Sequence, residues 1–156
     1  MLAVTSPILN QFGAIREALP QDAGALEALY RQLLPDHSDI RVSPDRLSAI
    51  RTNPDSFLLV YEIQGEIVAT VHLHLCMDAL CSDRPFAVIE RVVTASHVRG
   101  QGLGAILMRH AEETAKSRGA IKVMLSSNAR RADAHRFYEH LGYDGGGSRL
   151  FKKYLD

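Results

Sequence analysis

The spacing of apolar residues changes along the chain, and each change marks a different kind of element. Residues 13–18 suit a short first strand. Apolar residues then recur at intervals of three and four, which predicts an amphipathic helix from about Asp22 that stops at Pro35. Ser43 as N-cap and Pro44 at the first helical position predict a second, short helix that buries Leu47 and Ile50.

The middle of the chain has the composition of β-strands. The segments 56–62 and 66–77 are rich in β-branched and aromatic residues. Because Gln64-Gly65 separates them, they predict a hairpin with a tight turn. Residues 86–94 predict another strand.

Helices and strands then alternate to the end of the chain. Two helices are expected, each closed by a glycine: residues 102–118 with Gly119, and residues 131–141 with Gly142. Two strands are expected beside them: residues 121–125 and residues 148–154. This order predicts one α/β domain over residues 1–156, with a mixed sheet and helices on both faces.

Composition and charge exclude several classes of protein. The 156 residues are 46% hydrophobic and 23% charged, which is typical of a globular domain. Eighteen Lys and Arg balance eighteen Asp and Glu, so there is no global charge for binding nucleic acid or an anionic membrane. Neither a membrane-spanning run nor a signal peptide is recognisable, so we expect a cytoplasmic location. Cys76 and Cys81 are too few for a disulfide framework or a zinc site.

The strongest chemical signal is a glycine-rich turn. Arg99-Gly100-Gln101-Gly102-Leu103-Gly104 follows one predicted strand and opens a predicted helix. Glycines allow close backbone approach, and a helix N-terminus with an adjacent arginine suits a pyrophosphate. The spacing differs from the G-x-G-x-x-G of dinucleotide sites, which disfavours a nicotinamide-dependent oxidoreductase. A purely structural turn is the alternative.

The stretch from Ile89 to Tyr143 resembles the GNAT superfamily of acetyl-CoA-dependent N-acetyltransferases. The first family signature is present as Arg99, Gly102 and Gly104. A second signature follows, with its members at Ala134, Phe137, Tyr138, Gly142 and Tyr143. The run Ile89-Glu90-Arg91-Val92-Val93 is similar to that of a subgroup that includes glucosamine-phosphate acetyltransferases. The resemblance covers nearly the whole chain and implies a mostly antiparallel sheet with a splayed parallel strand pair that holds CoA.

The resemblance also implies roles for individual residues. The backbone of Val92, Val93 and Thr94 would bind the pantetheine arm. The CoA pyrophosphate would lie on the turn formed by Arg99, Gly100, Gln101, Gly102, Leu103, Gly104 and Ala105. Tyr138 would protonate the departing CoA thiolate, with core packing as its alternative role.

Further cofactor contacts are expected at the start of the last helix. Many family members carry an Asn seven residues before the tyrosine, where this chain has Arg131. Asn128 lies close by without being equivalent, so that contact is left open. Arg131 and His135 belong to a basic cluster that either meets the 3′-phosphate of CoA or forms a solvated helix start.

Acetyl transfer to an amine requires a base, because a primary amine is almost wholly protonated at pH 7. Glu90 is the candidate, since a carboxylate within an apolar strand is costly without a task or a partner. Its alternatives are a salt bridge or a strand-edge position, and a water chain could also act as the base. His72 and His74 share one strand face, but no third ligand accompanies them, so no metal is expected.

The sequence therefore predicts an N-acetyltransferase in which a small-molecule amine attacks acetyl-CoA directly in a ternary complex. The alternatives are a non-catalytic acyl-CoA sensor and acetylation of a peptide or protein amine. The loop 34–39 is expected near the acceptor, where Asp36 and Asp39 either attract an ammonium group or are simply solvated. Nucleic acid and membrane partners are not expected, and a homodimer is left open.

Overall fold

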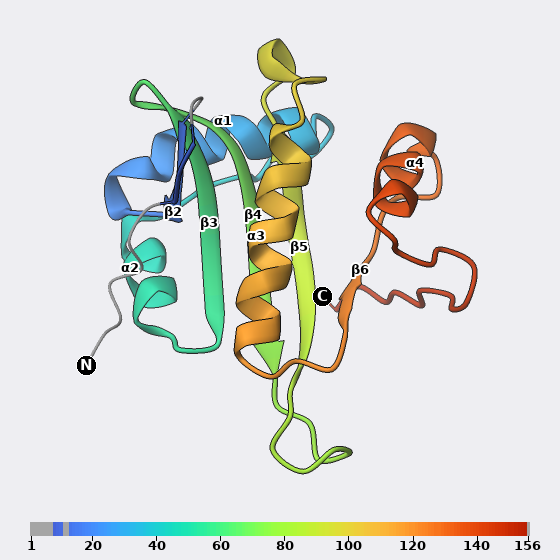
Figure 1. Ribbon diagram of the computed structural model, residues 1–156. Coiled ribbons are helices and arrows are strands. Elements are labelled where there is room, and N and C mark those ends of the chain that lie inside the picture. Colours follow the sequence, from blue (N-terminus) through green and yellow to red (C-terminus); the bar gives the residue numbers. More distant parts are fainter. Residues whose placement is uncertain (1–7, 11–12, 156) are drawn as a thin grey trace. The chain divides into compact units, whose positions relative to one another are not determined.

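The computed structural model describes residues 8–10 and 13–155 (Figure 1). Its contacts divide the chain into two compact units, of which the first ends at Met124 and the second begins at Leu125. The first unit carries most of the sheet and the helices α1–α3, whereas the second carries α4.

The strands form one sheet in the order β1 to β6. Their bounds are Ile8–Asn10 (β1), Gly13–Glu17 (β2), Ser56–Ile63 (β3), Glu66–Cys76 (β4), Phe86–Thr94 (β5) and Val123–Leu125 (β6). Neighbouring strands from β1 to β5 are antiparallel. The Ala87 N–H donates to Lys122 O at 2.9 Å and the Ile121 N–H to Pro85 O at 2.9 Å, so the segment before β6 runs parallel to β5. The expected mixed, mostly antiparallel sheet is confirmed.

Helices cover both faces of the first unit's sheet. They are α1 (Ala23–Leu33), α2 (Pro44–Thr52) and α3 (Leu103–Ser117), with short 3₁₀ turns η1 (Pro20–Asp22) and η2 (Ser96–Val98). Figure 1 shows α3 on one face and α1 and α2 on the other. Residues 58–61 and 68–71 are consequently buried on both sides, which explains why β3 is continuously apolar from Phe57 to Tyr61 instead of alternating with polar residues. No described helix is long and apolar enough to cross a membrane.

Local turn and cap signals are confirmed. Gln64 and Gly65 have φ of 49° and 82°, as a two-residue hairpin turn between right-twisted strands requires. The Ser43 side chain accepts a hydrogen bond from the Arg46 N–H and caps α2. Leu47 is buried as expected, whereas Ile50 is only half-buried.

The second unit contains α4 (Ala132–His140), and Gly142 follows it with φ of 93°. The expected strand at residues 148–154 is wrong, because residues 148–155 lie in no strand. β-Propensity produces a strand only where a ladder partner is available, and within this unit Leu125 is the sole described strand residue.

An ion-pair network ties β2, η1 and β3 together. Arg16 donates to Asp22 at 2.7 Å and to Glu62 at 2.8 Å, and Asp22 also accepts the Leu19 N–H at 2.7 Å. Burial raises the pKa of the nearly inaccessible Asp22, but the bonds from Arg16 and Leu19 outweigh it and hold this pKa below its usual value.

We expect Asp22→Asn to destabilise the fold by on the order of 3 kcal/mol at pH 7, because it leaves Arg16 partly uncompensated. The depressed pKa means that the wild-type carboxylate stabilises the fold above pH about 4, and that this contribution disappears as the pH falls through the native pKa. Urea unfolding should therefore be measured for both proteins at pH 7 and below pH 4. The free energy of unfolding of Asp22→Asn should lie closer to the wild-type value at the lower pH. Asp133→Asn, in an exposed pair with Arg136, should change little at either pH.

Candidate active site

The glycine-rich turn forms an open helix N-terminus. Gly100 and Gly102 both have φ of +81°, a left-handed conformation that a side chain would strain. No side chain caps α3, and the first backbone bond runs from the Ile106 N–H to Gly102 O at 3.1 Å. The preceding N–H groups of the helix therefore point outward without an intrahelical acceptor. A Cβ on either glycine would meet no atom within 4 Å, so the space above the turn is open.

The segment before this turn is fixed at several points. The Ala95 N–H donates to Val68 O at 2.7 Å, and the Ser96 N–H donates to the side chain of Gln32 in α1 at 3.0 Å. Arg99 is exposed and donates through Nε to Thr94 O at 3.0 Å. The turn and its arginine thus fit an anionic group such as a pyrophosphate.

A β-bulge interrupts the pairing of β4 with β5. Val93 pairs with Thr70 and Glu90 with His72, so Arg91 and Val92 together oppose Val71. Arg91 has φ of +57°, which is rare for a residue other than glycine. Such a bulge leaves backbone groups outside the regular ladder and is common beside active sites. Sequence reasoning missed it.

Glu90 lies half-buried in β5 just before the bulge. No hydrogen bond or ion pair joins its carboxylate to another described residue. β5 has β4 and β6 as neighbours, so it is an interior strand. Both structural alternatives for Glu90, a salt bridge and a strand edge, are thus absent from the described part of the chain.

His72 and His74 stack beside Glu90. Their ring centroids are 3.9 Å apart with the planes tilted by 35°, and His72 Nε2 lies 2.7 Å from Ser56 Oγ in β3. Burial and the neighbouring His74 lower the pKa of His72 to about 4. Burial also lowers the pKa of His74, although the nearby Glu90 carboxylate opposes this shift. No group of three residues that could hold a metal occurs among the described residues.

The predicted residues of the second unit gather around the start of α4. Asn128 Oδ1 accepts the Arg130 N–H at 2.9 Å, and Asn128 O accepts the Arg131 N–H at 3.0 Å and lies 2.9 Å from His135 Nε2. Asn128 therefore organises the turn that begins this helix. Ser127 Oγ is buried with no hydrogen-bond partner in the described part, and sequence alone did not mark it.

Tyr138 is buried within an aromatic cluster of the same unit. Its ring meets Phe137 and Tyr143 edge-on, at centroid distances of 5.2 and 6.0 Å. The Tyr143 N–H donates to Tyr138 O at 3.0 Å. The ring thus has the packing role that the helix pattern suggests, and an acid role for the hydroxyl stays a prediction.

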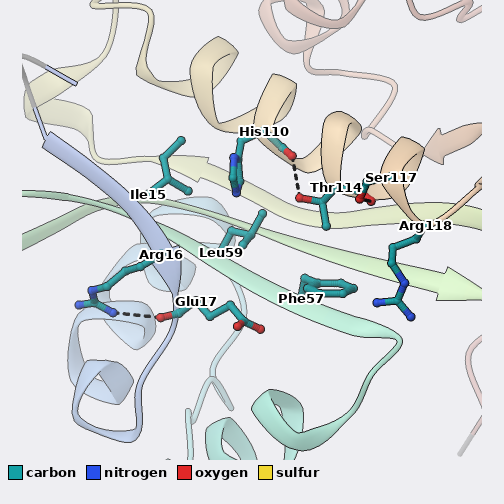
Figure 2. A pocket seen from close by; sticks show the side chains of 9 residues that line it. All are labelled: Ile15, Arg16, Glu17, Phe57, Leu59, His110, Thr114, Ser117 and Arg118. Atoms are coloured by element: carbon teal, nitrogen blue, oxygen red, sulfur yellow. Dashed lines mark hydrogen bonds between the residues drawn. The ribbon is translucent and has the colours of Figure 1, made fainter. Parts of the chain in front are cut away.

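A small pocket of about 240 Å³ lies on the other face of the sheet (Figure 2). Phe57 and Leu59 line it, and they alternate along β3 with Ser56, which contacts His72. The pocket is therefore separated from Glu90 by the sheet and contains none of the predicted site residues. His110 of α3 also lines it, and burial lowers the pKa of this histidine.

The predicted acceptor loop is polar and exposed. Asp36 and Asp39 are both exposed, and no ion pair holds either one in the described structure. An open pocket of about 430 Å³ between α1 and α2 is lined by Arg31 and Arg41 together with Glu27. The environment next to the loop is thus of mixed charge.

Comparisons with known proteins identify the family. The model of the Acetyltransferase (GNAT) family matches residues 25–143, so the chain belongs to this family. It is 33% identical over 129 residues to an aminoalkylphosphonate N-acetyltransferase of Salmonella typhimurium, covering 83% of each chain. The protein is thus a GNAT-family N-acetyltransferase, an acyltransferase of a family that uses acetyl-CoA as cosubstrate.

Solved structures agree with this assignment. A putative acetyltransferase from Agrobacterium tumefaciens matches with a TM-score of 0.82 and 31% identity, covering 90% of this chain and 99% of that one. Glucosamine-6-phosphate N-acetyltransferase from Arabidopsis thaliana matches with a TM-score of 0.79 and 28% identity, covering 94% of this chain and 100% of that one.

Proposed function

We propose that this protein transfers the acetyl group of acetyl-CoA to the amine of a small molecule by direct attack in a ternary complex. One observation carries the proposal: an unpartnered half-buried carboxylate, a β-bulge and an open helix N-terminus follow one another within residues 90–105. This reaction needs a base for the amine, backbone groups for the pantetheine arm and a turn that binds the pyrophosphate. The three features follow one another in the same order as these parts of the reacting molecules.

The cosubstrate would lie along β5 and the turn. The backbone of Val92, Val93 and Thr94 would bind the pantetheine arm, and a bulge N–H would stabilise the oxyanion that develops on the acetyl carbonyl. The turn from Arg99 to Ala105 would hold the pyrophosphate. We assign Asn128, Arg131 and His135 to further contacts with the cosubstrate on the basis of the family resemblance.

The chemistry divides between two side chains. Glu90 removes a proton from the acceptor ammonium, directly or through water, and the free amine then attacks the thioester carbonyl. The C–N bond forms, the C–S bond breaks, and Tyr138 protonates the departing thiolate. The nitrogen loses its second proton as it becomes an amide, and this proton returns to the Tyr138 oxygen through water. The proposed reaction has no covalent acetyl-enzyme and gives no role to the two cysteines, of which Cys76 ends β4 and Cys81 is exposed in the following loop.

The proposed acceptor carries a phosphonate or phosphate group as well as its amine. The names of two relatives support this class, an aminoalkylphosphonate N-acetyltransferase and a glucosamine-6-phosphate N-acetyltransferase. Arg91 supports it independently, because its exposed guanidinium directly follows Glu90 and has no carboxylate partner in the described chain. Arg91 also lies near Tyr30 of α1. Burial raises the pKa of this tyrosine, and the positive charge of Arg91 opposes the shift only in part.

Matched acceptor pairs test this class. We expect an aminoalkylphosphonate to be acetylated with a kcat/KM at least about tenfold above that of the same alkylamine without the phosphonate, as one charge-assisted contact allows. Arg91→Met should reduce this ratio and leave the rate with the plain amine unchanged. Equal rates for the two acceptors would remove the phosphoryl group from the proposal without affecting N-acetylation.

We expect Gly102→Val to weaken acetyl-CoA binding on the order of a hundredfold, because the side chain would occupy the space proposed for the pyrophosphate. Gly119→Val is the matched control. Gly119 has φ of +79°, lies in equally open space and follows the other end of α3. Both variants should therefore have similar backbone strain. Calorimetry that finds equal affinities in the two variants would exclude the turn from the binding site.

A further inference from the structure

The stacked histidines differ from each other in their hydrogen bonding. His72 is held by Ser56 Oγ at 2.7 Å. His74 contacts the His72 ring at a centroid distance of 3.9 Å, yet neither of its nitrogens has a hydrogen-bond partner among the described residues. His74 is only half-buried, and its nitrogens are not among the described buried atoms that lack a partner, so they are open to solvent. The His72 ring therefore holds one face of the His74 ring, while the His74 nitrogens remain available to accept a proton.

The pair also lies next to the proposed base. His72 is directly opposite Glu90 in the β4–β5 register, and the Glu90 charge acts on His74. Burial lowers the pKa of His74 and the Glu90 carboxylate opposes this shift, whereas burial and the neighbouring His74 both lower the pKa of His72. Because burial lowers both pKa values, both rings favour the neutral form. A neutral imidazole beside Glu90 can accept a proton from it.

The base needs such an acceptor in each turnover. Glu90 is half-buried, and no hydrogen bond joins its carboxylate to another described group that could take the proton. After it takes a proton from the ammonium group, it must lose that proton before the next acceptor binds.

We propose that His74 accepts this proton from Glu90 and passes it to solvent, while His72, anchored on Ser56, positions the His74 ring. The proposal rests on the proposed acetyltransferase function. An ammonium N–H bond breaks as the Glu90 O–H bond forms. That O–H bond then breaks and a His74 N–H bond forms through a water molecule between them, since the two side chains make no direct hydrogen bond, and the imidazolium finally releases its proton to water or buffer. No net charge accumulates on the protein over the cycle.

Steady-state kinetics of His74→Ala test the relay. We expect kcat to fall roughly tenfold or more, while the KM for acetyl-CoA and the melting temperature stay near the wild-type values. At constant pH and ionic strength, raising the concentration of imidazole buffer should restore part of the lost kcat, because a soluble base replaces the missing one. The wild-type protein should show no such dependence.

Two further variants separate relay from structure. His110→Ala removes another half-buried histidine, on the opposite face of the sheet, and should keep full activity without buffer dependence. Ser56→Ala releases His72 and should lower kcat less than His74→Ala does, without buffer rescue, because His74 remains present.

An NMR titration tests the coupling without any turnover. In Glu90→Gln the His74 pKa should fall relative to the wild-type protein, because the carboxylate that raises it is gone. An unchanged His74 pKa overturns the proposal even if acetylation is confirmed. So does a wild-type kcat in His74→Ala, or a loss of kcat that buffer does not restore. Absence of turnover with every amine would instead contradict the proposed function, while the titration still decides whether Glu90 and His74 are coupled.

Discussion

Glu90→Gln should lower kcat by about 10²–10⁴ and leave the affinity for acetyl-CoA nearly unchanged. The amide has the size of the carboxylate but cannot take a proton from the acceptor ammonium. Because Glu90 has no ion pair among the described residues, its replacement breaks no salt bridge, and the melting temperature should not fall. Stopped-time assays of thiol release at saturating acceptor would measure the loss.

Glu113→Gln on the exposed side of α3 is the control and should behave as the wild-type protein does. Raising the pH should partly restore Glu90→Gln, since more of the acceptor is then already deprotonated. An unchanged kcat at neutral pH would assign the proton transfer to a water chain, and Glu90 would lose its role.

Tyr138→Phe should lower kcat by about 10²–10⁴ as well, for a different reason. Phenylalanine keeps the buried ring and its edge contacts with Phe137 and Tyr143, while the hydroxyl that would protonate the thiolate is lost. Acetyl-CoA binding and the melting temperature should stay close to the wild-type values. A donor with a better thiolate leaving group should recover part of the rate, because it depends less on protonation.

Three results would distinguish the roles of this tyrosine. Recovery with the activated donor supports the acid role. Unchanged turnover makes Tyr138 a packing residue, and a steep fall in melting temperature indicates a structural hydrogen bond instead. Tyr154→Phe, which removes an exposed hydroxyl, should have no effect on any of these measurements.

The fold was predictable where the signal is local. The β3–β4 hairpin follows from two β-rich runs around Gln64-Gly65, and β5 begins and ends at the predicted residues. The three-residue β1 was missed because so short a strand has no periodicity of its own. The strand predicted at residues 148–154 is wrong, since propensity alone cannot supply a ladder partner.

The candidate site was predictable only in part. The glycine-rich turn and Glu90 are visible as residue types in one stretch of sequence. The bulge at Arg91 is a register mismatch between β4 and β5, so the sequence of β5 alone cannot reveal it. The alternation of β4 predicts that His72 and His74 share a face, but the contact with Ser56 depends on pairing with β3.

The most direct test of the central claim is to incubate the protein with acetyl-CoA and a panel of small amines that includes an aminoalkylphosphonate. CoA thiol release and the mass of the product are followed together. We expect one thiol released for each N-acetylated amine, with intersecting initial-rate patterns that indicate a ternary complex. Tight binding of acetyl-CoA without its consumption by any amine would contradict this account and identify a binding module on an acetyltransferase fold.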